Sequence, residues 1–332
     1  MNTPVRRPTA PLLSTRTAQI VLGGAWLLDG LLQLQPRMFT QAFVTQVLQP
    51  SAQGQPHWLG SLVNANARFV ATDVRGWNAV FAAAQLLIGA GLVMRATVKP
   101  ALVLSFVWSA GVWVLGEGCG MLLTGHASAL TGAPGAVLLY AVIGIVAWPG
   151  QPSTAPVTRG RSREVRGRLV WAVVWVLFAG LWLLPGNTKR GSIGAAISAM
   201  GAGQPGWLAH LETSVGRLFS ASGMPDTVAL AIVSLIIGLG PLVVRPGNPF
   251  FVAGAALSLT FWVFGQAFGG VLVGPSSGTA TDPNAGPLLA FLAVALVNVD
   301  VAGWCSAAGP VDETASIPAV GALGAVSGVA TA

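Results

Sequence analysis

Two acidic side chains lie inside apolar stretches of this chain, where a charge is costly. Glu117 stands among glycines in WVLGEGCGMLLTG (113–125), and Asp29 lies in AWLLDGLLQLQP. An acid at the centre of a membrane costs about 2.5–3.5 kcal/mol, and such acids commonly serve a ligand, an ion or a proton path. We therefore predict Glu117 and Asp29 as ligand-binding groups. Pairing of Glu117 with Arg68 or Arg75 at the membrane surface is an equally weighted structural interpretation.

A second stretch, WVFGQAFGGVLVG (262–274), repeats the first with glutamine at the position of the acid. The second copy also lacks an acid near the position of Asp29, where it has Ala179. Because only one copy keeps these charges, we predict a single polar site. The predicted ligand-binding residues are Glu117, Asp29, Arg68, Gln266, Trp113 and Arg217.

The glycines in the two copies have a spacing that is typical of helix association. Gly116-x3-Gly120 and Gly265-x3-Gly269 are small-xxx-small pairs, which allow two helix backbones to approach closely in lipid. They predict that the helices carrying them pack together near the axis that relates the copies.

The sequence gives little indication of a metal site or of a catalytic site. His126, Cys119 and Met121 are the candidate ligands of a soft metal such as copper, although their spacing matches no recognised site and a surface histidine is the simpler interpretation. No Walker, zincin or nucleophile-elbow motif occurs. A non-enzymatic protein is therefore favoured, no cofactor is implied by a motif, and a quinone remains compatible with the sequence.

Composition places the chain in a membrane. Of its 332 residues, 53% are hydrophobic and 8% are charged, whereas a soluble domain carries about 25% charged residues. The formal net charge of +7 comes from arginines and lysines that flank apolar runs. This pattern is typical of basic cytoplasmic loops and excludes nucleic acid as the expected partner. The expected partners are the lipid bilayer and other membrane proteins.

Apolar runs of nearly the length needed to cross a bilayer predict an all-α integral membrane protein. Eight spans are expected near 17–35, 77–95, 100–122, 134–150, 168–186, 227–244, 249–272 and 286–304. An offset of 149 residues matches GQPHWLGSL (54–62) with GQPGWLAHL (203–211) and continues without a gap to Gly125. The chain is therefore predicted to contain two four-helix repeats.

An even number of spans in each repeat makes the repeats parallel. The basic residues predict that both termini are cytoplasmic in a multi-pass protein of the cell inner (plasma) membrane. Amphipathic helices are expected in the long outer loops, with Trp58 and Trp207 at the headgroups. The predicted division is a first repeat (1–150), a basic linker (151–167), a second repeat (168–304) and a disordered cytoplasmic tail (305–332).

Each repeat resembles the DoxX/DoxD-like family of four-helix membrane proteins. The residues that carry the resemblance are GGAWLLDGLLQLQP in the first helix, a long outer amphipathic segment, and QLLIGAGLVMR before a short basic turn. The resemblance implies a bacterial membrane subunit associated with respiratory or thiol/quinone redox systems, often without a cofactor of its own.

These observations favour an accessory membrane subunit that binds a lipid, a quinone or a partner protein in an outward-facing cavity. A proton- or cation-coupled transporter is the first alternative, because Asp29 and Glu117 could form a path. A quinone-linked membrane oxidoreductase is the second.

Overall fold

The computed structural model describes residues 9–150, 156–244, 247–274 and 278–300. Residues 11–298 form one compact unit. Two three-residue strands, β1 (Thr9–Pro11) and β2 (Asn298–Asp300), pair with each other. The expected tail, 305–332, lies outside the described residues.

Residues 11–298 are built from helices and short helical turns. The helices are α1 (Thr15–Gln33), α2 (Gln41–Phe43), α3 (His57–Ala71), α4 (Val74–Val93), α5 (Val98–Leu115), α6 (Ala136–Ala147), α7 (Pro156–Trp182), α8 (Ser192–Met200), α9 (Gly206–Leu218), α10 (Met224–Val243), α11 (Asn248–Phe264) and α12 (Ala285–Leu296). The turns are η1 (Pro36–Phe39), η2 (Val44–Leu48), η3 (Gln49–Ala52), η4 (Arg95–Thr97), η5 (Cys119–Thr124) and η6 (Ala267–Val273). Because α7 begins at Pro156, most of the segment expected to be a linker is helical.

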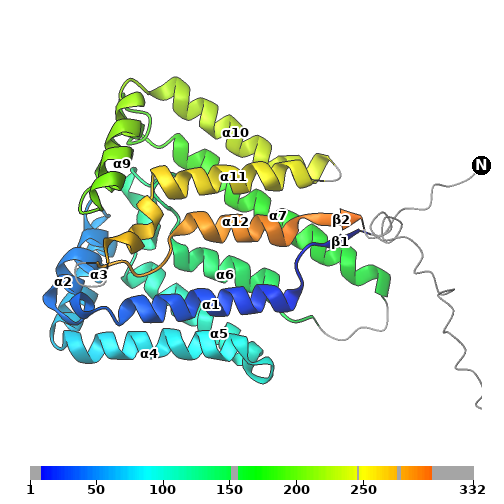
Figure 1. The fold of residues 1–332 in the computed structure, drawn as a ribbon, viewed down its shortest axis with the longest axis horizontal. Helices are drawn as coiled ribbons and strands as arrows, with labels where there is room; N and C mark the ends of the chain where they lie inside the picture. The colour runs from blue at the N-terminus through cyan, green and yellow to red at the C-terminus, as the bar shows by residue number, and fades with distance from the viewer. Residues whose placement is uncertain (1–8, 151–155, 245–246, 275–277, 301–332) are drawn as a thin grey trace, which may run out of the picture. The chain divides into compact units, whose positions relative to one another are not determined.

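The long helices run along one direction, and α2, α3 and α9 gather at one end of them (Figure 1). Helix α1 packs on α4, α7 packs on α10, and the short helices α6 and α12 pack on each other at the centre. Side-chain caps fix several helix starts: Ser14 accepts the Thr17 N–H at 3.0 Å, and Asp73 accepts the Gly76 N–H at 3.0 Å. The two amphipathic segments form helices α3 and α9, as the sequence predicts.

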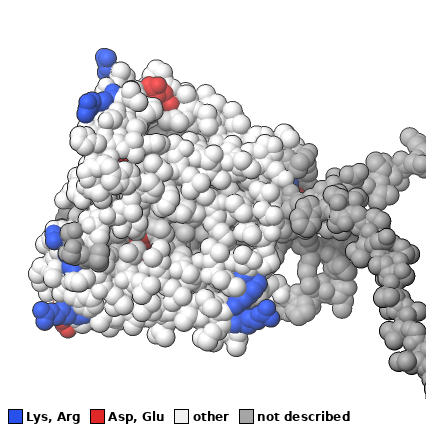
Figure 2. Space-filling model, in the orientation of Figure 1, with Lys and Arg blue, Asp and Glu red and all other residues white. Residues whose placement is uncertain are grey.

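Fewer helices than expected are long and apolar enough to cross a membrane. Among the described residues, four helices meet this description, α4, η4–α5, the part of α7 from Glu164 and α10, and α11 with η6 makes a fifth if that pair, bent by 45°, is one span. Helices α6 and α12 have only 12 residues each, or about 18 Å. Helix α1 is long enough, but it buries the polar side chains of Gln19, Asp29 and Gln33. Between its ends the visible surface of the bundle is almost free of charge (Figure 2).

Several helix ends lie 149 residues apart. Helices α6 and α12 match at both ends, α3 and α9 match at their starts, and α5 and α11 match at their last residues. Two hydrogen bonds correspond in the same way. The indole N–H of Trp113 donates to the Pro134 carbonyl at 2.8 Å, and that of Trp262 donates to the Pro283 carbonyl at 2.8 Å.

The glycine pairs do not associate two helices, contrary to the sequence prediction. Helix α5 ends at Leu115 and Gly116 caps it. Four consecutive residues, 118–121, then have positive φ, as do their counterparts 267–270. A Cβ on Gly120 would lie 1.9 Å from the Pro134 carbonyl oxygen. The glycines therefore permit a left-handed turn that receives the loop before α6, because L-residues with side chains adopt this conformation at a cost.

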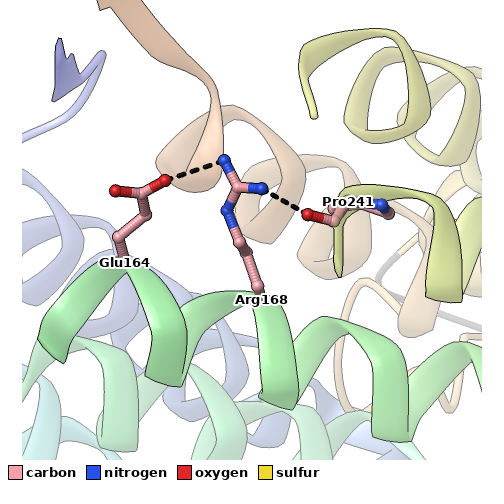
Figure 3. Close-up of polar contacts among 3 residues, drawn as sticks. All are labelled: Glu164, Arg168 and Pro241. Atoms are coloured by element: carbon pink, nitrogen blue, oxygen red, sulfur yellow. Dashed lines mark hydrogen bonds and ion pairs between the residues drawn. The ribbon is translucent and has the colours of Figure 1, made fainter. Parts of the chain in front are cut away.

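Helix α7 holds the C-terminal part of α10 through polar contacts (Figure 3). Pro241 lies inside α10 and has no N–H for the carbonyl of Ile237. The Trp171 indole N–H donates to that carbonyl at 2.9 Å. One turn earlier, Arg168 donates to the Pro241 carbonyl and pairs with Glu164 at 2.8 Å. Thus two side chains on one face of α7 donate hydrogen bonds to carbonyls in the C-terminal part of α10.

The first half uses an arginine in the same way. Arg16, near the start of α1, donates to the carbonyl of Leu92 at 3.1 Å and also to that of Val93. Leu92 is the residue 149 positions before Pro241, so both arginines bind corresponding carbonyls. A cation at a helix C-terminus is favourable because the last carbonyls lack intrahelical partners.

Candidate ligand cavity

A cavity of about 260 Å³ lies in the first half of the bundle, beneath the end formed by α2 and α3. Its walls come from α1, α4 and α5, from α2, η2 and α3, from the start of α6, and from the loop before α12. The polar residues that line it are Asp29, Gln33, Asn66, Gln85, Glu117, Thr281 and Asp282. Asp29 and Glu117, which the sequence predicts as one site, therefore share a cavity.

Glu117 is positioned by the break after α5. Its side chain accepts the backbone N–H of Val137, the second residue of α6. Gly135, with φ of 106°, lies against the same carboxylate, so a Cβ there would be 1.9 Å from Oε2. That oxygen has no hydrogen-bond partner. Glu117 thus anchors the start of α6 with one oxygen and has acceptor capacity remaining in the cavity.

Gln266, which lies 149 residues after Glu117, holds the start of a helix without a charge. Its Oε1 accepts the N–H of Gly286, the second residue of α12, at 3.0 Å. Its Nε2 donates to the Leu130 carbonyl at 3.3 Å. The shared role of this position is to anchor a helix start. Only the first copy leaves a carboxylate oxygen there without a partner.

Asp29 is 2% exposed and points toward the middle of the bundle. The hydroxyl of Tyr140, from α6, donates to its Oδ1 at 2.9 Å. Trp26 packs on Tyr140 with ring centroids 4.8 Å apart. The residue 149 positions after Asp29 is Phe178, and Ala179 follows it, so the prediction that pairs Asp29 with Ala179 is wrong by one residue. The second copy still has no acid here.

Asp282 is an acid whose position before Pro283 predicts a structural turn rather than a binding role. Its Oδ1 accepts the Asn284 N–H at 2.7 Å and its Oδ2 accepts the Thr281 hydroxyl at 2.8 Å, an arrangement typical of a turn. Its side chain also lines the cavity. Burial raises the pKa of Asp282, while the hydrogen bonds from Thr281 and Asn284 lower it. The corresponding residue of the first half is Ala133.

Contacts between the halves bring Asp282 to the cavity. The Gln35 side chain, just after α1, donates to the Ala280 carbonyl at 3.0 Å. Reciprocally, the Asn187 side chain, just after α7, donates to the Ala127 carbonyl at 2.7 Å. Each loop thus crosses to the other half. No local sequence signal indicates that crossing, so the sequence could not place Asp282 beside Asp29.

Four predicted site residues lie elsewhere. Arg68 and Arg217 are exposed and do not line the cavity. Trp113 is bonded to Pro134, and Gln266 anchors α12. Glu117 accepts a hydrogen bond from the Val137 N–H, whereas the structural interpretation of the sequence pairs it with Arg68 or Arg75.

The candidate metal ligands are not grouped around a common point. His126 is exposed and lies against Gly186, and Cys119 is half-buried. The sulfur of Met121 accepts a hydrogen bond from Gln55 at 3.3 Å. Within the described ranges, no three His, Cys, Asp or Glu side chains are placed so that they could hold a metal ion.

Glu212 is a further buried acid, on α9 and outside the cavity. It is 0% exposed, and both of its carboxylate oxygens lack a hydrogen-bond partner. Its backbone neighbours include Gly201, whose Cβ would lie 3.3 Å from the Glu212 Cβ. Burial raises the pKa of Glu212 to about 7. The first half has Val63 at this position.

Glu212→Gln is expected to stabilise the protein at alkaline pH and to have little effect at pH 5. A raised carboxyl pKa means that the folded state favours the proton, so this stability is lost as the pH rises through about 7. We expect a difference of about 1–2 kcal/mol at pH 8.5, after allowance for solvent screening near the bundle end. Thermal unfolding in detergent across pH 5–8.5 measures it. The exposed acid in Asp226→Asn is the control, and parallel pH profiles for Glu212→Gln and wild type would contradict the prediction.

Comparison with known proteins gives no relative for this arrangement. No protein-family model, curated protein or solved structure matches the chain.

Proposed function

We propose that this protein is a non-enzymatic subunit of the cell inner membrane that binds a small ligand in the acid-lined cavity. In this proposal the chain is two parallel four-helix repeats with both termini cytoplasmic, related to the DoxX/DoxD-like proteins. The matched helix ends and hydrogen bonds support the repeat. The basic residues Arg16, Arg95 and Lys99 at the end opposite α3 support the orientation.

One observation carries the ligand proposal: carboxylates from both halves converge on one cavity that contains unpaired acceptors. Asp29 and Glu117 come from the first half and Asp282 comes from the second. Glu117 Oε2 and Gln85 Oε1 have no hydrogen-bond partner. Buried polar atoms without partners are uncommon in folded proteins and are frequent at functional sites.

The walls suggest a ligand that arrives from the bilayer. Phe43, Phe81 and Trp108 supply aromatic surface, and Val107 on α5 lines the cavity while 65% exposed. The cavity therefore reaches the outer surface of α5, which is apolar. The volume of about 260 Å³ suits a small ligand or the head of a lipid-like molecule better than a whole lipid.

A cation- or proton-coupled transporter is the second candidate, because the same three acids could pass a cation. It would need polar groups that continue from Asp29 toward the opposite end of α1. The neighbours on that side include Trp26, bonded to Ser105 at 2.9 Å, and Leu22, both buried. This apolar packing favours a binding site that is closed at its inner end.

Mass spectrometry of small molecules that co-purify in mild detergent tests the proposal. We expect a molecule enriched with wild type and depleted about tenfold or more with Glu117→Gln, since a charge-assisted hydrogen bond contributes about 1.5–3 kcal/mol. Gln266 shows that glutamine can still anchor the helix start, so the variant should fold. Asp226→Asn, which changes an exposed acid, is the matched control. Equal enrichment in all three proteins would overturn the ligand site.

A further inference from the structure

We propose that the cavity recognises an organic cation, namely an ammonium group attached to an aromatic ring or a short apolar chain. This inference rests on the proposed function and specifies the chemical class of the ligand. It is carried by the charge of the lining, by an unpaired buried amide and by an aromatic wall.

The charge of the lining is entirely acidic. Asp29, Glu117 and Asp282 contribute three carboxylates from three separate segments, and among the residues that the structure describes no Lys, Arg or His lines the cavity. Burying carboxylates is unfavourable unless a cation or hydrogen-bond donors offset their charge. An anionic ligand would add to this repulsion. A cationic ligand would supply the missing countercharge.

Unpaired acceptors give an independent indication. Gln85, on α4, is only 8% exposed, and its Oε1 has no hydrogen-bond partner. Glu117 Oε2 is likewise without one, whereas Trp108 Nε1 is an unpaired donor. All three residues line the cavity. The excess of free acceptors favours a ligand that donates N–H groups, and an ammonium has up to three of them.

The aromatic residues form a continuous wall. The ring centroids of Phe43 and Phe81 are 6.2 Å apart, and those of Phe81 and Trp108 are 5.8 Å apart. Aromatic faces attract cations and also pack against apolar groups. A cavity of about 150 Å³ holds benzene, so a volume of 260 Å³ accommodates a ring with a short chain. A bare metal ion suits this lining less well, because it would use none of the aromatic surface.

Three probes with one body and different heads test the inference on the purified full-length protein in detergent. They are 2-phenylethylammonium, 2-phenylethanol and 3-phenylpropanoate, titrated calorimetrically into wild type, Glu117→Gln, Asp282→Ala and Asp226→Asn. Asp282→Ala introduces the residue that the first half has at this position, Ala133. Asp226→Asn serves as the control for partition of the probes into micelles.

We expect the ammonium to bind wild type and Asp226→Asn equally, and about tenfold or more weaker to Glu117→Gln and Asp282→Ala. The alcohol should bind wild type at least about tenfold more weakly than the ammonium, and the carboxylate should not bind. If the alcohol or the carboxylate bound more tightly than the ammonium, and if that binding depended on Glu117, the ligand would not be a cation. The ligand site itself would then still be supported. Absence of Glu117-dependent binding for every probe would also overturn the cation class. The proposed function would fail as well only if the co-purified molecules were also unchanged in Glu117→Gln.

Discussion

Arg168→Met is expected to lower the free energy of unfolding by about 2–3 kcal/mol, because it removes a charged donor from a buried carbonyl and breaks a half-buried ion pair. Arg168 is 4% exposed, pairs with Glu164 at 2.8 Å and donates to the Pro241 carbonyl. Methionine fills part of the same volume but provides neither the charge nor the donors. Denaturant unfolding in detergent, followed by tryptophan fluorescence, measures the loss. Arg166→Met, which changes an exposed arginine of the same helix, should alter stability by no more than about 0.5 kcal/mol.

The neighbouring bond from Trp171 tests the same arrangement by a double-mutant cycle. Trp171→Phe should be destabilising, because the Ile237 carbonyl loses the donor that compensates for Pro241. In a Pro241→Ala background the backbone N–H of residue 241 can serve that carbonyl, so Trp171→Phe should cost less. Equal costs in the two backgrounds would show that the indole does not compensate for the proline.

Gly120→Ala should destabilise the protein by about 2–5 kcal/mol, as measured by the same unfolding assay. Gly120 has φ of 60°, which costs an alanine about 1–2 kcal/mol. The new Cβ would also lie 1.9 Å from the Pro134 carbonyl oxygen, so the loop before α6 must move. That overpacking adds about 1–3 kcal/mol.

Gly125→Ala separates the two contributions. Gly125 has φ of 74°, but a Cβ there would meet nothing within 4 Å. It should therefore cost only the backbone strain, about 1–2 kcal/mol. If both substitutions cost the same, close approach of the Pro134 loop is not the reason for the glycine at position 120. Gly120→Ala should also disturb the position of Glu117 in the cavity. The loop that must move leads into α6, where the Val137 N–H donates to Glu117.

Much of the architecture follows from local sequence. The apolar runs predict helices, and the amphipathic stripes predict α3 and α9, because periodicity and breakers act within one segment. The offset of 149 residues also anticipates the matched ends of α6 and α12. The prediction that the glycine pairs associate two helices was wrong, because their spacing suits either helix packing or a left-handed turn. Only the position of the following loop distinguishes these two uses.

The candidate site, like the fold, follows only in part from the sequence. Sequence alone predicts Asp29 and Glu117 as candidate site residues, because a charge in an apolar run is conspicuous wherever the chain folds. It could not find Asp282 or Gln85, since an aspartate before proline is also an ordinary turn residue and a glutamine in a helix has no distinctive spacing. The tertiary structure brought these four together, because the loop before α12 crosses to the first half and contacts Gln35. That crossing depends on contacts between segments about 245 residues apart, and no local pattern contains them.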